Sequence, residues 1–176
     1  MYVYRGEKVN LKISEFILPN KVKVKKEVVE HRGASLIIPV LEDGRLVMVE
    51  QFRPILGVWL LEFPAGTIEK GEDALSCAKR ELVEEAGYVA QEIEELFKSY
   101  PSPGYSDEIL HIFVAKKLSE VQSHPENYEL IKVRKLKVNE ILNILSREKT
   151  LDMKTVAALF YYLNCDKCLK ENVDPK

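Results

Sequence analysis

Segment 73–86 limits the possible folds most, because its apolar residues recur with the period of a helix that packs against a core. At about 100° per residue, one arc of that helix would collect the apolar side chains of Ala74, Leu75, Ala78, Leu82 and Ala86. Gly87 follows, where helices often end in a left-handed residue. Glu81 and Glu85 lie just beside the arc, and Glu84 lies further round. The helix is therefore expected to place carboxylates at the margin of a core.

These three glutamates repel one another, because residues three and four apart are neighbours on a helix. Most glutamate runs form solvated faces, and that interpretation suits Glu84. It suits Glu81 and Glu85 poorly, since solvating carboxylates belong opposite the apolar arc. A divalent cation among the three would relieve the repulsion, because Mg²⁺ binds carboxylate oxygens and keeps waters and substrate phosphates as further ligands.

Strand and helix patterns fill the rest of the chain. Residues 1–32 alternate apolar and polar side chains, which predicts antiparallel strands with one buried face. Two β-rich runs flank Gly44 in the sequence EDG and predict a hairpin. Further strands are expected at 59–63, 91–99, 107–118 and 128–136, and helices at 138–147 and 152–164. The order predicts an α+β fold, with helices packed outside a mixed sheet as an α/β/α sandwich.

Composition argues against several classes of protein. The chain has 26 basic and 28 acidic residues, unlike the strongly basic surface of nucleic-acid binders. Its apolar runs fall far short of the ~20 residues that cross a bilayer, and the first residues lack a signal-peptide pattern. We therefore expect a cytoplasmic protein with no nucleic-acid or membrane partner. The three cysteines are too few for a disulfide framework, and the pair Cys165 and Cys168 is interpreted as incidental.

The residues from Gly66 to Tyr88 have the spacing of a known motif. Gly66, five residues, Glu72, seven residues and the run Arg80-Glu81-Leu82-x-Glu84-Glu85-x-Gly87-Tyr88 match G-x5-E-x7-R-E-U-x-E-E-x-G-U, where U is apolar. Only Tyr88 departs from the pattern, and mildly, because its ring is large. This is the Nudix box. The chain therefore resembles the Nudix hydrolases, which cleave nucleoside diphosphates linked to another moiety.

The resemblance implies a metal site on the predicted helix. The implied ligands of Mg²⁺, or of Mn²⁺, are Glu81 and Glu85, with Glu84 assisting and the carbonyl oxygen of Ala65. Glu72 and Arg80 would form an ion pair that fixes the loop on the helix and aims the carboxylates. Arg80 and Glu84 are therefore placed with the catalytic residues. The implied reaction is attack of a metal-activated water on a diphosphate.

Features outside the box resemble one branch of the family, the ADP-ribose pyrophosphatases. Pro103 in SPGYSDE lies sixteen positions after Gly87, a spacing similar to that of Nudix enzymes acting on ADP-ribose. The segments VEQFRP and LLEFPAG are similar as well, so the resemblance covers roughly residues 30–163. It implies cleavage of ADP-ribose to AMP and ribose 5-phosphate. The substrate-binding residues implied are Arg53, Glu62, Pro103, Gly104 and Glu108. For Arg53, a surface ion pair is the alternative interpretation.

The base that activates the water is expected in the loop SHPENYEL, with Glu129 and Glu126 both as candidates. The resemblance also implies that residues 1–32 form a small antiparallel sheet that reaches a second subunit of a homodimer, beside a Nudix domain at 33–170. Phe16 could stack on adenine there, or it could be a core or interface residue.

Two alternatives remain open. The substrate could be another nucleoside diphosphate derivative, such as a nucleoside diphosphate sugar, a dinucleoside polyphosphate or NADH. The chain could instead be a catalytically silent nucleotide sensor. Such sensors usually lose box glutamates or gain a DNA-binding domain, and this chain does neither.

Overall fold

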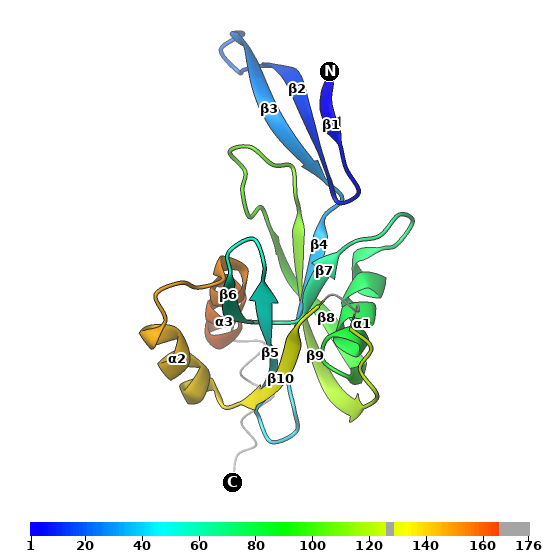
Figure 1. The fold of residues 1–176 in the computed structure, drawn as a ribbon, viewed down its shortest axis with the longest axis vertical. Coiled ribbons are helices and arrows are strands. Elements are labelled where there is room, and N and C mark those ends of the chain that lie inside the picture. The colour runs from blue at the N-terminus through cyan, green and yellow to red at the C-terminus, as the bar shows by residue number, and fades with distance from the viewer. Residues whose placement is uncertain (126–128, 166–176) are drawn as a thin grey trace.

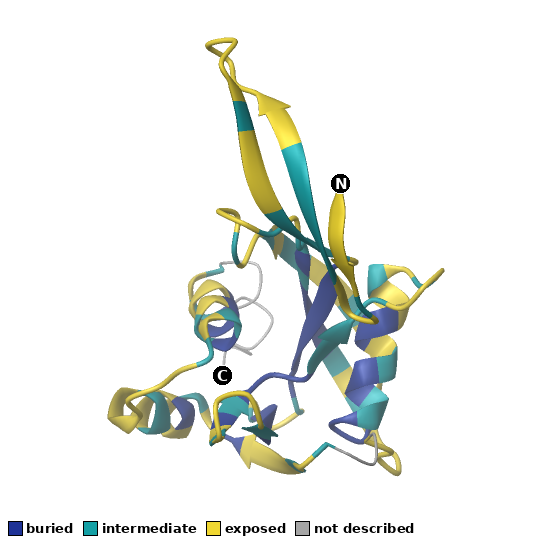
Figure 2. Cartoon of the chain, turned by 45° about the horizontal axis from the view of Figure 1, so that its top comes forward, coloured by how far each residue is buried: buried dark blue, intermediate teal, exposed yellow. Residues whose placement is uncertain are grey.

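The computed structural model describes residues 1–125 and 129–165. The first strands form a sheet of their own, in the order β1-β2-β3, with antiparallel pairing throughout. These strands are β1 (Tyr2–Arg5), β2 (Val9–Ile17) and β3 (Lys23–His31). The sheet extends away from the rest of the molecule (Figure 1) and is mostly exposed (Figure 2). The predicted N-terminal antiparallel sheet is confirmed.

Two further sheets form the body of the molecule. The first has the order β7-β4-β9-β8, in which β4 and β9 run parallel and the other pairs antiparallel. Its strands are β4 (Ala34–Pro39), β7 (Ala65–Thr67), β8 (Tyr88–Ser99) and β9 (Leu110–Glu120). The second is antiparallel, in the order β10-β5-β6, from β5 (Leu46–Arg53), β6 (Val58–Glu62) and β10 (Ile131–Leu136). The body is therefore mixed, as predicted.

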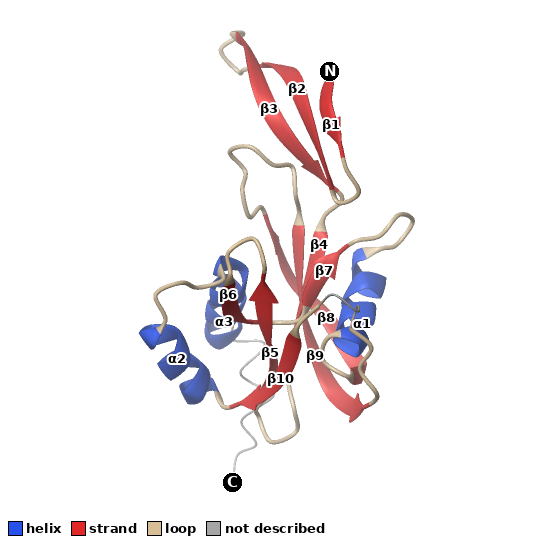
Figure 3. Cartoon of the chain, viewed as in Figure 1, coloured by secondary structure: helices blue, strands red, loops and turns tan. Residues whose placement is uncertain are grey.

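Helices cover the strands on both sides, which confirms the α/β/α arrangement. They are α1 (Ala74–Glu84), α2 (Val138–Arg147) and α3 (Met153–Asn164), with α1 on one side and α2 and α3 on the other (Figure 3). Along β4, Leu36 and Ile38 join the core that holds α2 and α3, while Ile37 joins the core under α1. This alternation follows from the two-residue period of a strand. None of the helices in 1–125 and 129–165 is long and apolar enough to cross a membrane.

The hairpin predicted around Gly44 is correct only in its turn. Gly44 has a φ of 77°, and the amide of Leu41 donates to the carbonyl oxygen of Arg45 at 2.9 Å. Beyond an isolated bridge between Val40 and Leu46, the two strands separate into different sheets. Turn chemistry fixed the local reversal, but β4 pairs instead with β7 and β9, where its residues are buried on both faces.

The buried face of α1 differs from the predicted arc. Leu75 is 39% exposed, so its predicted place in the core is wrong, and Cys77 is fully buried instead. The face that packs on the strands includes Cys77, Ala78 and Glu81, and it continues to Glu85. Glu81 is 7% exposed and Glu85 is 3% exposed. The two carboxylates therefore lie within the buried face and not merely beside it.

Candidate active site

Arg80 hydrogen-bonds to the acidic side chains at the loop before α1 and on α1 itself. Its Nε and Nη2 donate to Glu72 at 3.0 and 3.1 Å, which is the ion pair implied by the resemblance. Its Nη1 donates to Glu81 at 2.6 Å and to Glu84 at 3.0 Å, and Nη2 also donates to the carbonyl oxygen of Thr67 at 3.2 Å. The hydrogen bonds that Arg80 donates to Glu72, with the charge of Glu81, raise the pKa of Arg80. One guanidinium thus ties the loop before α1 to two carboxylates of the helix.

The surroundings of Glu81 and Glu85 supply too little positive charge to hold the pKa values of these buried carboxylates in their usual range. Burial raises the pKa of Glu85 to about 8, the charge of Glu81 adds to this, and the hydrogen bond from the amide of Ala65, at 2.9 Å, opposes it. Burial also raises the pKa of Glu81 to about 7, although Arg80 opposes the rise. Arg80 is shared among three glutamates, so it does not offset the burial of Glu81.

These residues suit a hard divalent cation by their chemistry. As they lie, no three His, Cys, Asp or Glu side chains among residues 1–125 and 129–165 are grouped so as to hold a metal ion. Glu81 and Glu84 are turned toward Arg80, and Glu85 accepts from Ala65. However, the two buried carboxylates with raised pKa have too little positive charge beside them. A cation bound by carboxylate and carbonyl oxygens would supply that charge.

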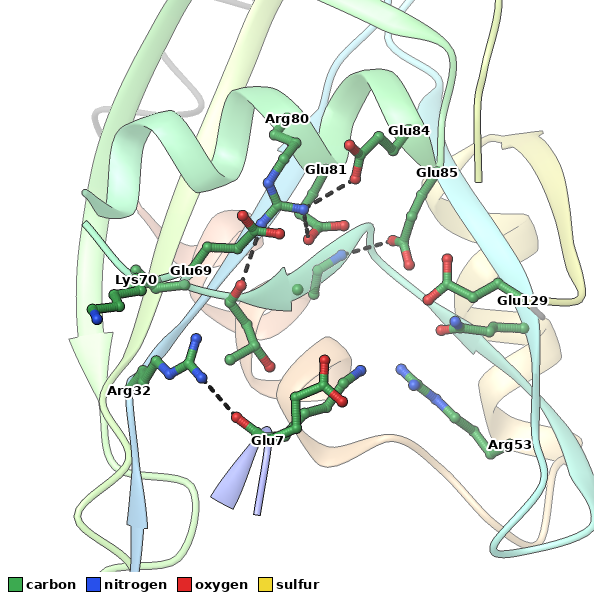
Figure 4. Close-up of a pocket in the computed structure, with 16 residues that line it drawn as sticks. Glu7, Arg32, Arg53, Glu69, Lys70, Arg80, Glu81, Glu84, Glu85 and Glu129 are labelled. Atoms are coloured by element: carbon green, nitrogen blue, oxygen red, sulfur yellow. Dashed lines mark hydrogen bonds and ion pairs between the residues drawn. The ribbon is translucent and has the colours of Figure 1, made fainter. Parts of the chain in front are cut away.

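A cavity of about 430 Å³ opens in front of these carboxylates. The α1 side is formed by Arg80, Glu81, Glu84 and Glu85, and Figure 4 shows Arg32 and Glu7 on the opposite side. The wall also includes Lys8, Gln51 and Arg53, so cationic side chains face the acidic helix across the cavity. The cationic side chains can bind an anion such as a phosphate, whereas the carboxylates of α1 would face that anion only with a cation between them.

Arg53 reaches the cavity from the end of β5 and is anchored from behind. Its Nε and Nη2 donate to the two carboxylate oxygens of Glu62 at 2.7 and 2.6 Å, a bidentate pair. Glu62 is 1% exposed and also accepts from Lys154 of α3. Burial raises the pKa of Glu62, but Arg53 and Lys154 outweigh it and hold that pKa below its usual value. Arg53 is thus in an ion pair with a buried carboxylate, and not in the surface ion pair of the alternative interpretation, and it also lines the cavity.

Glu129 lies beside Glu85, near the C-terminal end of α1 (Figure 4). It lines the main cavity and a neighbouring cavity of about 460 Å³ that also contains Arg53 and Glu62. Burial is the main reason for the raised pKa of Glu81 and Glu85, and the charge of Glu129 adds to it, so Glu129 is close to both. Figure 4 shows its carboxylate directed toward Glu85. The other candidate base, Glu126, lies outside the described residues.

The other sequence-predicted residues are not among those that line the main cavity in this single chain. Pro103 and Gly104 lie in the loop before β9, with Gly104 exposed. Glu108 lies at the end of the same loop, with its Oε1 3.8 Å from Nδ1 of His31. Phe16 is 45% exposed on β2. Their roles in substrate binding stay predictions.

Sequence reasoning missed several residues that line the main cavity. They are Glu7, Lys8, Arg32 and Gln51. For Gln51 a signal existed, because residues two apart on a strand share a face and Gln51 lies two before Arg53. The other three are brought to the cavity by the packing of the N-terminal sheet, and nothing in their local sequence indicated it. Lys154 was missed for the same reason, since its partner is 92 residues away.

Comparison with known proteins then decides the family. A family model described as NUDIX domain matches residues 30–160. The chain belongs to the Nudix family. This Nudix chain is 35% identical to the ADP-ribose pyrophosphatase of Bacillus subtilis (strain 168), over 90% of its own length and 87% of that protein. It is 38% identical to the methanol dehydrogenase activator of Bacillus methanolicus, over 96% of its own length and 91% of that protein.

A solved structure agrees with the fold of this Nudix protein. The crystal structure of an ADP compounds hydrolase superposes with a TM-score of 0.79, covering 98% of this chain and 92% of that chain. The two sequences are 23% identical, so this likeness speaks for the fold alone. The resemblance drawn from the box between Gly66 and Tyr88 is confirmed at the level of the family.

Proposed function

We propose that this Nudix protein is a divalent-metal-dependent hydrolase that cleaves ADP-ribose to AMP and ribose 5-phosphate, with Mg²⁺ as the metal and Mn²⁺ as a substitute. The observation that carries the proposal is the pair of buried carboxylates, Glu81 and Glu85, facing cationic side chains across one cavity. The spacing of Pro103 from Gly87 and the identity with a relative named ADP-ribose pyrophosphatase support ADP-ribose as the substrate.

Four groups would hold the metal. They are the carboxylates of Glu81 and Glu85, that of Glu84 in an assisting role, and the carbonyl oxygen of Ala65. When bound, a divalent cation supplies charge neutralisation for the diphosphate and lowers the pKa of a water. Arg80 and Glu72 position the carboxylates through the hydrogen bonds described above.

Glu129 is proposed as the general base. Its carboxylate accepts a proton from the attacking water while the water oxygen forms a bond to one phosphorus. The bond from that phosphorus to the bridging oxygen breaks, and its electron pair leaves with the second phosphate. Arg53 would donate to phosphate oxygens, and its bidentate pair with Glu62 holds it rigidly for that task. Glu126 stays the alternative base.

Residues 1–32 are proposed to join two copies of the chain, beside a Nudix domain at 33–170. Large apolar side chains are exposed on the N-terminal strands and their connecting turn, namely Tyr2, Tyr4, Phe16, Ile17 and Val22. Exposed apolar patches of this kind commonly mark an interface. In the dimer, Phe16 would stack on adenine, and Pro103, Gly104 and Glu108 would contact substrate. Size-exclusion chromatography with light scattering tests this, and a monomer would count against the shared site.

Hydrolysis assays test the function. ADP-ribose should be cleaved with Mg²⁺, and cleavage should be lost with a chelator or in Glu85→Gln. Sugar nucleotides, dinucleoside polyphosphates and NADH should be assayed in parallel. Turnover of a sugar nucleotide equal to or better than that of ADP-ribose would remove the ADP-ribose assignment. Binding of ADP-ribose without hydrolysis of any compound would support a silent sensor.

A further inference from the structure

The N-terminal sheet meets the body of the molecule where the end of β3 lies beside the loop before β9. Val29 forms a parallel β-bridge with Ser106. The amide of Val29 donates to the carbonyl oxygen of Tyr105 at 2.8 Å, and its carbonyl oxygen accepts from the amide of Asp107 at 3.3 Å. The hydroxyl of Ser106 donates to the same carbonyl oxygen at 3.0 Å. The loop therefore extends the N-terminal sheet by a short additional pairing on β3.

The side chain of Asp107 joins two strands of that sheet. Its Oδ1 accepts from the amide of His31 at 2.9 Å, at the end of β3. Its Oδ2 lies 3.7 Å from Nζ of Lys12 on β2. Backbone pairing alone would hold one strand edge, whereas the carboxylate also contacts the strand beside it. We call residues 105–107 the junction latch.

The strand that the latch holds, β3, leads directly into the wall of the main cavity. Arg32 follows His31, and its Nη2 donates to the carbonyl oxygen of Glu7 at 2.7 Å. Glu7 and Lys8 lie in the turn between β1 and β2, and all three line the cavity. Figure 4 shows Arg32 and Glu7 opposite the acidic face of α1. The orientation of the N-terminal sheet therefore decides whether this part of the wall is in place.

The linker that follows is short and closely packed. Gly33 has a φ of 95°, and a Cβ there would lie 3.0 Å from the carbonyl oxygen of Ile109. The amide of Ala34 donates to that same oxygen at 2.9 Å, and the amide of Ile68 donates to the carbonyl oxygen of Gly33 at 3.0 Å. Because the linker is fixed to the body, movement of the sheet must occur at residues 29–32, where the latch acts.

We propose that Ser106 and Asp107 are positioning residues, which hold the N-terminal sheet so that Arg32, Glu7 and Lys8 form one wall of the substrate cavity. The inference rests on the proposed function for the identity of the substrate, but the latch itself can be tested without it. Apparent affinity falls in proportion to the fraction of molecules in the binding-competent arrangement. The acidic helix lies in the body, so weakening the latch raises KM and leaves kcat nearly unchanged.

Residue-resolved amide hydrogen exchange tests the latch directly. Each variant is monitored at the amide whose acceptor the substitution leaves intact: His31 in Ser106→Ala, and Val29 in Asp107→Ala. Both amides should exchange at nearly the rate of an unprotected amide, because a tenfold rise in KM requires the junction to be open in about nine molecules of ten. The amide of Ile37, which donates to Pro64 within the body, should not change. Exchange within about twofold of wild type at both junction amides would overturn the latch.

Kinetics test the positioning role. With ADP-ribose, Ser106→Ala and Asp107→Ala should each raise KM about tenfold, with kcat within about twofold. Arg32→Ala should raise KM similarly while leaving exchange at Val29 and His31 unchanged, because it removes the cavity group and not the latch. Faster exchange with an unchanged KM would overturn the positioning role. A wild type without activity on ADP-ribose would overturn the proposed function, and the exchange result would still decide the latch.

A matched control tests whether losing any aspartate that accepts a hydrogen bond from a backbone amide has the same effects as losing Asp107. Asp43 accepts from the amide of Arg45 at 3.1 Å and from its Nε at 2.7 Å, in the turn far from the N-terminal sheet. Asp43→Ala should leave KM and exchange at Val29 unchanged. Thermal melting of all variants identifies any that fail to fold. If Asp107→Ala fails to fold, Ser106→Ala tests the proposal alone, because it removes only one hydroxyl.

Discussion

A Cβ atom on Gly66 would lie 1.7 Å from Oε1 of Glu81. Non-bonded atoms do not approach so closely, so the absence of a side chain at Gly66 is what allows the Glu81 carboxylate to lie against β7. The motif therefore requires glycine here for space and not for an unusual backbone angle.

Gly66→Ala should displace the Glu81 carboxylate and reduce ADP-ribose hydrolysis by about 100-fold or more, as expected when a catalytic group moves by about 1 Å. Steady-state kinetics and Mn²⁺ titration measure the loss. Gly44→Ala is the control: its φ of 77° makes alanine strained in a remote turn, so stability should fall while activity is kept. Full activity of Gly66→Ala would contradict the role of Glu81.

Glu85→Gln should stabilise the metal-free protein at pH 8. The pKa of Glu85 is raised from 4.5 to about 8 in the folded state, so the folded protein binds more protons than the unfolded one between these values. Stability is therefore lost as pH rises from 4.5 toward 8. Glutamine removes that loss and can still accept from the amide of Ala65.

Thermal melting in chelator measures this effect. We expect Tm of Glu85→Gln to exceed that of wild type by several degrees at pH 8, at about 2–4 °C per kcal/mol, with the difference shrinking at pH 5. Glu84→Gln, on the more exposed side of α1, should show no such gain. A Glu85→Gln protein less stable than wild type at pH 8 without metal would contradict the prediction.

Metal binding should release protons near neutral pH. Burial raises the pKa of Glu81 to about 7 and that of Glu85 to about 8, so a share of the molecules holds protons that a cation must displace. Titration calorimetry with Mn²⁺ at pH 7, in two buffers of different ionisation enthalpy, should give different heats. Affinity should weaken as pH falls from 8 to 6. Equal heats in both buffers would indicate that no proton is displaced.

Lys154→Met should destabilise the protein by about 2–4 kcal/mol, because Glu62 is 1% exposed and, among the residues that the structure describes, would keep Arg53 alone as an ion-pair partner. Urea unfolding measures the change. The double variant Lys154→Met with Glu62→Gln should recover part of it, since the unpaired charge is gone. Lys135→Met is the control: its partner Glu120 is largely exposed, so the change should stay within about 1 kcal/mol. Strict additivity in the double variant would exclude coupling between Lys154 and Glu62.

The sequence by itself determined the features that depend on local chemistry. Helical periodicity predicted α1, α2 and α3 close to their observed bounds, and the turn at Gly44 and the helix end at Gly87 followed from positive φ. The spacing from Gly66 to Tyr88 identified the family. These signals are short in range, because a helix, a turn and a loop-helix motif are each encoded within a few tens of residues.

Tertiary structure decided everything that joins distant segments. The expected partner of β4 was its neighbour across the turn, but burial on both faces directed it to β7 and β9. Leu75, expected in the core, is exposed and Cys77 is buried instead, because the strands under α1 set the rotation of the helix. The hydrogen bonds from Lys154 to Glu62 and from the amide of His31 to Asp107 join residues more than 70 positions apart. Such contacts depend on how layers pack, which no local pattern encodes.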